Sequence, residues 1–389
     1  MAALPPRLAA LHGFIVGRAL PLWATAGVDA SAAFHEQLQL DGRPDPESVR
    51  RMRGQARQIY VYAHATLLGL YDGAALAVAA FDRMIADYWQ ADGGFSLSVG
   101  PDGAPHDRRR TAYDQAFGLL SMAWLHRLTG SAVYADWAAR TLAFMDTTLA
   151  DPAGGYADHV GATTRCQNPH MHLLEALLAW FEATGDARFL VRADAVHALF
   201  ATRFLDRSVP VLREFFNARW TLDPVRGDHV DPGHHLEWVW LLDRYRRYRP
   251  DAADETPALL VAARRGIDPR DGLVMDEMHA DGRILRGTKR MWPQTEHLKA
   301  QVVLFERDPA RGADGIDRVC GLLMDHYLDP ATGTWNDQVG GDGRRLSTVS
   351  PASSFYHLFL AYTEAMRVAG APSPVEAGRA GLSPRCRTG

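Results

Sequence analysis

A short turn recurs along this chain at intervals of about sixty residues. The glycines of its copies are 61, 118 and 61 residues apart, and a degenerate copy, Arg213-Glu214-Phe215, falls at the middle of the double interval. Self-similarity at a fixed period indicates stacked copies of one supersecondary unit. Each copy has a glycine followed two places later by an aromatic or aliphatic residue: Gly93 with Phe95, Gly154 with Tyr156, Gly272 with Val274, and Gly333 with Trp335.

Helical periodicity fills the intervals between the turns. Apolar residues spaced three and four positions apart predict twelve helices, in six pairs. Asn168 and Asp231 each precede a proline, which predicts an N-cap and the first helical residue, while Gly130 and Gly185 stand where helices should end. The predicted helices lie near residues 5–24, 47–71, 75–90, 111–129, 132–149, 168–184, 187–205, 232–249, 254–266, 292–307, 312–327 and 351–369.

Six helix pairs at this period predict an all-α fold, the (α/α)6 barrel. An open α-solenoid is the competing architecture, but six repeats are the number that closes this ring. Alternating segments at 95–99 and 334–339 predict short β-hairpins in the loops at one end of the barrel. Because the repeat runs from end to end, residues 1–369 are expected to form a single catalytic domain, and residues 370–389 a disordered tail.

Charge and composition argue against several classes of partner. The formal net charge is only -4, which gives no field to recruit nucleic acid or an anionic membrane. Hydrophobic residues make up 47% of the chain and charged residues 23%, as in an ordinary globular protein. The expected partner is therefore a small molecule that is uncharged or nearly so, and the expected assembly is a monomer or small homo-oligomer.

The cysteines and the N-terminus bear on the compartment. Cys166, Cys320 and Cys386 are far apart and match no metal or redox spacing, which favours a reduced, cytoplasmic setting. The apolar N-terminal stretch is interrupted by Arg18 and Pro21 and follows helical periodicity, so it is interpreted as the first helix rather than a signal peptide. No uninterrupted apolar run is long enough to predict a membrane span.

A second series of residues runs in step with the turns. Polar and aromatic residues stand near the starts of alternate helices, so in a closed ring they should converge at one end, where long loops supply the walls of a pocket. The series consists of Arg57, Tyr113 with Asp114, His172 with Glu175, His234 with Glu237, Trp292 with Glu296, and His357.

Asn168, His172 and Glu175 are spaced four and three residues apart, so on a helix they share one face. A single histidine of this kind is more often a satisfied core residue than a functional one. The pattern repeats, however, at His234 and Glu237, and His357 adds a third imidazole at the corresponding position. A carboxylate one turn from an imidazole can orient it and raise its basicity. Three histidines at equivalent positions of a repeat therefore favour acid–base chemistry.

The same histidines do not predict a metal site. His170 and His172, like His234 and His235, are too close in sequence for a helix to point both side chains at one ion, and no clustered Cys/His motif is present. We therefore expect neither a catalytic metal nor a cofactor.

Two further residues of the series have alternative interpretations. Arg57 is as compatible with a solvated surface position as with binding a ligand, and Trp292 is as compatible with ordinary packing as with binding. A tryptophan flanked by carboxylates and amides, however, suits a sugar ring.

With these residues identified, the chain resembles the N-acylglucosamine 2-epimerase superfamily, and within it the branch of mannose isomerases and sulfoquinovose isomerases. The resemblance extends from about Arg57 to His357. It implies that His234 and His357 are the acid/base pair, that Glu237 orients His234, that Arg57, Asn168 and His172 hold sugar oxygens, and that Trp292 contacts the ring. Ser353 and Ser354 stand where some relatives have a larger polar residue. Tyr113, Glu175 and Glu296 complete the expected binding residues.

The implied reaction is metal-independent interconversion of D-mannose and D-fructose, or of related sugars such as lyxose, through an enediolate. Histidine suits both directions of the proton transfer because its pKa lies near neutrality. A sugar 2-epimerase of the mannose/glucose or N-acylglucosamine type is the first alternative. A glycan hydrolase on the same barrel, which would need a pair of pocket carboxylates, is the second, and a sugar-binding module without activity is the last.

Overall fold

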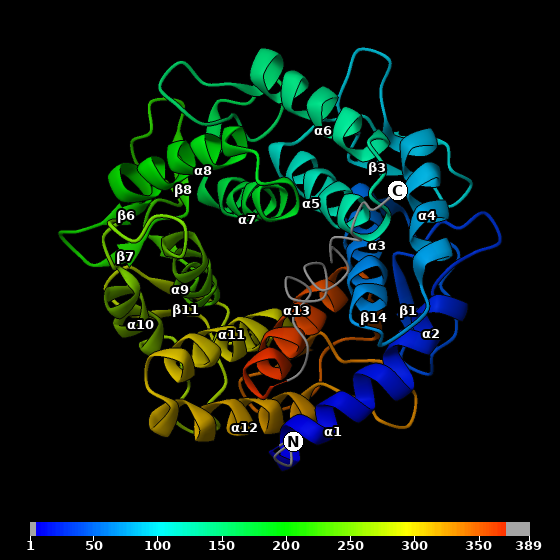
Figure 1. The fold of residues 1–389 in the computed structure, drawn as a ribbon. Coiled ribbons are helices and arrows are strands. Elements are labelled where there is room, and N and C mark those ends of the chain that lie inside the picture. Colours follow the sequence, from blue (N-terminus) through cyan, green and yellow to red (C-terminus); the bar gives the residue numbers. More distant parts are fainter. Residues whose placement is uncertain (1–4, 371–389) are drawn as a thin grey trace, which may run out of the picture.

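The computed structural model describes residues 5–370, and in them two concentric rings of helices surround one axis (Figure 1). The inner ring consists of α3 (Met52–Leu67), α5 (Ala112–Thr129), α7 (Gln167–Thr184), α9 (Pro232–Arg246), α11 (Met291–Arg307) and α13 (Ser353–Val368). Each inner helix packs against the next, and α13 packs against α3, so the ring is closed. The predicted (α/α)6 barrel is confirmed.

The outer ring contributes the first helix of each pair. It consists of α1 and α2 (Pro6–Phe14 and Leu20–Thr25, joined by the π-helical turn Ile15–Ala19), α4 (Ala74–Tyr88), α6 (Val133–Phe144), α8 (Ala187–Leu199), α10 (Thr256–Arg264) and α12 (Pro309–His326). Helices α6 and α8 continue into π-helical turns at Met145–Leu149 and Phe200–Phe204. The expected tail beyond residue 370, and Cys386 with it, lie outside the described residues.

The two rings bury their side chains differently. Outer helices are amphipathic: α4 buries Ala77, Phe81, Met84 and Tyr88, which follow one face at helical spacing. Inner helices are buried on nearly every side over their first three turns, because outer helices cover one face and the barrel interior the other. Polar residues on an inner helix therefore need partners inside the protein.

The helix ends agree with the sequence in part. Gly130 and Gly185 end α5 and α7 in left-handed conformations, with φ of 69° and 71°, and the Asp231 side chain caps α9 by accepting from the Gly233 N–H at 2.9 Å. Asn168 was expected to cap α7, but that helix begins one residue earlier, at Gln167, so the prediction is wrong. The predicted helix at 47–71 begins only at Met52 because Arg50–Arg51 form a strand.

Short strands lie at the end of the barrel where the inner helices begin. The residues just before each inner helix pair with the loop of the following repeat, and β14, before α13, pairs with β1 and so closes the circle. The strands are β1 (Gln37–Gln39), β2 (Arg50–Arg51), β3 (Ser98–Val99), β4 (Pro105–Asp107), β5 (Thr164–Cys166), β6 (Leu205–Asp206), β7 (Val211–Leu212), β8 (Phe215–Asn217), β9 (His229–Val230), β10 (Glu277–His279), β11 (Ile284–Arg286), β12 (Lys289–Arg290), β13 (Gln338–Val339) and β14 (Val349–Pro351). The hairpin predicted at 95–99 is present as β3–β4, and β6–β7 and β10–β11 form further hairpins. In the segment at 334–339, Trp335 bridges Leu328 and Val339 bridges Arg345 in antiparallel fashion, while β13 also pairs with β12.

Each recurring turn is held by one side chain in the first turns of an inner helix or, at Ser350, just before the helix. Gln115 illustrates the arrangement: its Oε1 accepts from the Phe95 N–H at 2.8 Å, and its Nε2 donates to the Thr111 carbonyl four residues earlier. His235 makes the same two contacts, with the Leu212 N–H at 2.9 Å and the Asp231 carbonyl at 2.8 Å. The six anchors are Gln55, Gln115, His170, His235, Gln294 and Ser350.

These anchors correct the sequence repeat at two points. The degenerate copy, the fourth of the six turns in chain order, centres on Leu212 rather than on Phe215. A further copy, ahead of those found in the sequence, centres on Phe34, where Ala32 takes the left-handed conformation, with φ of 66°, that Gly93, Gly154, Gly272 and Gly333 adopt in four other copies.

The N-terminal helix Pro6–Thr25 is long and apolar enough to cross a membrane by length and composition alone. In the fold it is the outer helix of the first pair, and it buries Leu8, Leu11, Phe14 and Trp23 against the barrel, where α1 contacts α12 and α13.

Candidate active site

A cavity of about 610 Å³ opens at the end of the barrel where the inner helices begin. Every inner helix contributes to its wall, because the sixty-residue repeat brings the first turns of all six to one place. The sequence-predicted residues that line it are Arg57, Tyr113, Asn168, His172, His234, Glu237, Trp292 and His357. Glu175 and Glu296, expected to bind substrate, lie beneath this wall and hold histidines instead.

His234 is paired with Glu214, 2.9 Å from Nδ1 to Oε2. Glu214 lies in the loop before α9 and also accepts from the Gln167 side chain at 2.8 Å, which fixes its position. The expectation that Glu237 orients His234 is therefore wrong, since Glu237 lies one turn along α9 and its carboxylate is directed toward Lys299 and His172, both 3.9 Å away. With Nδ1 engaged, Nε2 of His234 is left for a substrate.

The surroundings of His234 favour its charged form. Burial disfavours a charged imidazole, but the nearby carboxylates of Glu214 and Asp231 outweigh it and raise the pKa of His234 to about 9. The same crowding acts on Asp231, whose burial raises its pKa to about 7. His234 is accordingly an imidazolium at neutral pH and can donate a proton.

His357 forms the second carboxylate pair, 2.8 Å from Nδ1 to Glu296 Oε1. Glu296 is itself buried and its other oxygen lies 2.6 Å from Lys299 Nζ. Burial, together with the positive charges of Arg57 and Lys299, lowers the pKa of His357 well below its ordinary value. His357 is therefore neutral and can accept a proton, the opposite of His234.

Trp292 connects the two pairs. Its ring centroid lies 5.0 Å from the His234 ring and 5.7 Å from the His357 ring, so both imidazoles border one space beside the indole. Arg57 faces this space from α3, held by the Ser353 carbonyl at 3.1 Å and the Tyr113 hydroxyl at 2.7 Å. A sugar resting on Trp292 would have an acid and a base within reach.

A third histidine, His172, has the spacing-predicted partner. Its Nδ1 lies 3.3 Å from Glu175 Oε2, and the Tyr356 hydroxyl donates to the same oxygen. Burial alone would raise the pKa of Glu175, but its contact with His172 lowers it. The pattern Asn-x-x-x-His-x-x-Glu thus places an oriented imidazole at the cavity, next to Tyr113 and Phe117.

Several polar atoms of the wall are buried with no hydrogen-bond partner: Arg57 Nε, Asn168 Oδ1, Glu214 Oε1 and Glu237 Oε2. Unpaired buried groups are costly, so their presence around a cavity points to a ligand that supplies several hydroxyl groups.

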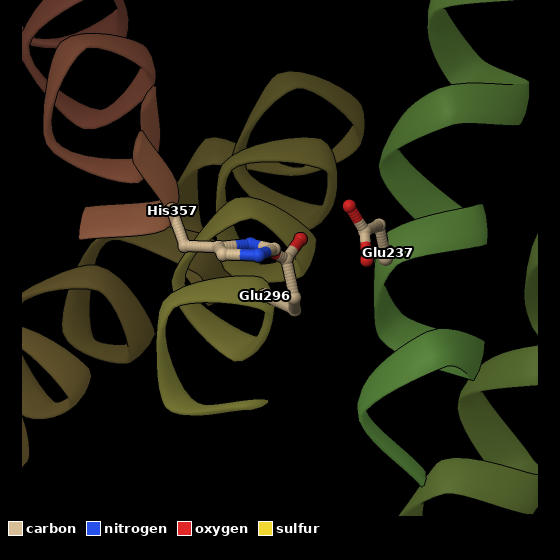
Figure 2. Close-up of side chains that lie close together, drawn as sticks. All are labelled: Glu237, Glu296 and His357. Atoms are coloured by element: carbon tan, nitrogen blue, oxygen red, sulfur yellow. The ribbon is translucent and has the colours of Figure 1, made fainter. Parts of the chain in front are cut away.

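Glu237, Glu296 and His357 could in principle hold a metal, because one ligand atom of each lies within 4.8 Å of the others (Figure 2). These side chains come from α9, α11 and α13 and point toward one another. The Lys299 ammonium already supplies a positive charge to both carboxylates, and His357 Nδ1 is engaged with Glu296. A divalent cation would have to displace these contacts, so metal independence stays our prediction.

Three residues of the site were not found by sequence reasoning. Glu214 stands in a loop, so helical spacing gave no signal, although it belongs to the degenerate copy of the turn. Lys299 lies three residues after Glu296 on α11, which is a detectable spacing. Asp231 was interpreted only as a cap, yet its second oxygen faces Arg290 at 3.5 Å and lies on the cavity wall.

Comparison with known proteins agrees with this geometry. Residues 33–361 match the model of the N-acylglucosamine 2-epimerase (GlcNAc 2-epimerase) family. A mannose-6-phosphate isomerase of Rhizobium meliloti (strain 1021) is 32% identical over 380 residues, which cover 91% of this chain and 95% of that protein. A D-mannose isomerase of Thermobifida fusca is 28% identical over 345 residues, covering 80% and 83%. A solved structure of a D-mannose isomerase superposes with a TM-score of 0.85 at 21% identity, covering 92% of this chain and 98% of that one, and shares the fold.

Proposed function

The chain belongs to the N-acylglucosamine 2-epimerase family, and we propose that it is an aldose–ketose isomerase that interconverts D-mannose and D-fructose. Its relatives are sugar isomerases and epimerases, so it is an enzyme of that kind, acting on a monosaccharide. The observation that carries the finer proposal is the pair of histidines that border one cavity, each held at Nδ1 by a buried glutamate, in surroundings that raise the pKa of His234 and lower the pKa of His357.

The two histidines suit the two halves of the reaction. His357 takes the proton from C2 of open-chain mannose, and the electron pair of the broken C–H bond forms the C1–C2 double bond. His234 donates a proton to O1, which gives the enediol. His234 then removes the O2 proton as the C2 carbonyl forms, and His357 returns its proton to C1. Both imidazoles end in their starting states, and the product is fructose.

The remaining wall residues fit substrate positioning. Trp292 offers an apolar face to the C–H side of the sugar, and the unpaired polar atoms of Arg57, Asn168 and Glu237 match sugar hydroxyl groups. His234 has a second task, to protonate the ring oxygen as the pyranose opens.

No step of the proposed reaction requires a Lewis acid. We therefore expect dialysis against EDTA to leave turnover unchanged, and recovery of a lost activity by Mn²⁺ or Zn²⁺ would contradict this.

A sugar 2-epimerase is the second candidate, because the family includes 2-epimerases and the enediol is common to both reactions. The outcomes differ only in where the proton returns. Return to C1 gives the ketose, and return to C2 on the opposite face gives the epimer.

The deciding experiment is incubation of the enzyme with mannose in deuterated water, followed by NMR of the products. We expect fructose to accumulate. Glucose without fructose would favour the epimerase, and cleavage of a disaccharide with neither product would overturn both assignments.

A further inference from the structure

Lysine is nearly absent from this chain. Of its 42 basic Lys and Arg residues, only Lys289 and Lys299 are lysines, and both are completely buried, with 0% of their surface exposed. Each is paired with two carboxylates: Lys289 with Asp268 and Asp271, and Lys299 with Glu296 and Glu237. A compact ammonium fits such a position, whereas a planar guanidinium is larger and needs a wider arrangement of partners.

Lys299 lies directly behind the proposed base. Its Nζ is 2.6 Å from Glu296 Oε2, while the other oxygen of Glu296 holds His357 Nδ1 at 2.8 Å. On its far side the ammonium rests against the Trp240 ring, 4.4 Å from the centroid, so it is held between the indole and the carboxylates. Lys299 does not line the cavity and acts only through Glu296 and Glu237.

The surroundings of the Glu296 carboxyl group favour its protonated form. Burial and the neighbouring Glu237 raise its pKa, and Lys299 is the nearest group that opposes this rise. A protonated Glu296 would donate its proton to His357 Nδ1 rather than accept from it. The imidazole would then carry its proton on Nε2, the nitrogen that must accept the substrate proton, and the base would be blocked.

We infer that Lys299 is a positioning residue: its ammonium keeps Glu296 ionised, and the ionised Glu296 holds His357 in the tautomer with Nδ1 protonated and Nε2 free. The inference rests on the proposed role of His357 as the base. The charged or titratable groups that act on the Lys299–Glu296 pair are Glu175 on α7, Glu237 on α9, and Tyr356 and His357 on α13. Arg57 on α3, His172 on α7 and His234 on α9 act on His357 itself.

The kinetic test is a double-mutant cycle. Lys299→Met should lower kcat at least about tenfold at pH 7 with little change in KM, and raising the pH should restore part of it as Glu296 loses its proton. In a Glu296→Gln background, Lys299→Met should lower kcat less than about twofold. The reason is that the amide oxygen of Gln can accept from His357 Nδ1 whether or not a positive charge lies nearby. Equal losses in both backgrounds would overturn the inference.

The structural test needs no turnover, so its result is independent of the substrate assignment. In protein labelled with ¹⁵N-histidine, His357 should carry its proton on Nδ1 in the wild type and shift toward Nε2 in Lys299→Met. Lys289→Met, which removes the other buried lysine, serves as the matched control and should leave the tautomer unchanged. An Nε2-protonated His357 in the wild type, or no shift in Lys299→Met, would refute the inference.

Discussion

Two walls of the same cavity hold a histidine against a glutamate, yet they produce opposite charge states. On the α9 wall, Glu214 and Asp231 surround His234 with negative charge. On the α11–α13 wall, the carboxylate beside His357 is already balanced by Lys299, and Arg57 adds a further positive charge. The contact distances are nearly equal, 2.9 and 2.8 Å, so the difference lies in the charges that surround each imidazole–carboxylate pair.

Removing the proposed base should have the largest effect. His357→Ala should lower kcat at least ~100-fold and abolish deuterium exchange at C2, because His357 is the imidazole that α13 presents to the cavity as the proposed base. The measurement is single-substrate kinetics with NMR of recovered mannose. Exchange at C2 that persists at the wild-type rate would assign the base to another residue.

Removing the partner on the other wall should change the pH profile. His234 has a raised pKa, so its charged form is present below about 9 and is lost as pH rises through that value. Glu214→Gln should bring the pKa back toward the ordinary 6.5 and move the alkaline limb of kcat/KM to lower pH. At pH 8 we expect a loss of about tenfold, and little loss below pH 6. An unchanged alkaline limb would show that Glu214 does not set the charge of His234.

Substitution of Glu237 tests whether this carboxylate, one turn after His234 on α9, contributes less to catalysis than the carboxylates that hold the two histidines. It has no hydrogen bond to either acid/base histidine, and its contacts with His172 and Lys299 are at 3.9 Å. Glu237→Gln should therefore keep measurable turnover, with a loss of several-fold that falls mainly on KM. A loss as large as that of His357→Ala would place Glu237 in the proton transfer itself.

The smallest effect is expected at His235, the immediate neighbour of His234. Its two nitrogens are used by Leu212 N–H and the Asp231 carbonyl, and burial lowers its pKa to about 4. Gln115 makes the same two contacts in another repeat. His235→Gln should thus change kcat/KM by less than about twofold and the free energy of unfolding by about 1 kcal/mol. It is the matched control for substitutions at His234.

The repeat made most of the fold predictable. Apolar spacing placed twelve helices, and the common phase of their polar residues predicted the cavity that the structure shows. The repeat could not be recognised in the sequence where the turn lacks its glycine: Ala32 adopts the glycine conformation of the first turn, and Pro210 stands two places before Leu212 in the fourth.

Sequence reasoning could predict contacts between site residues that lie on the same helix. Helical spacing correctly paired His172 with Glu175, since both lie on α7. It could not pair His234 with Glu214 or His357 with Glu296, because those carboxylates come from a loop and from a different helix. Contacts between side chains of different elements depend on how those elements pack, and the charge states of the histidines depend on these contacts.

The opposite charge of the two histidines is most directly tested by titrating them in the free enzyme. We would follow ¹⁵N-labelled histidine signals by NMR, assigned with His234→Asn and His357→Asn variants, from pH 5 to 10. His234 should be an imidazolium at neutral pH and titrate near 9, while His357 should remain neutral throughout. Two histidines that titrate together near 6.5, or a His357 charged at neutral pH, would contradict the account.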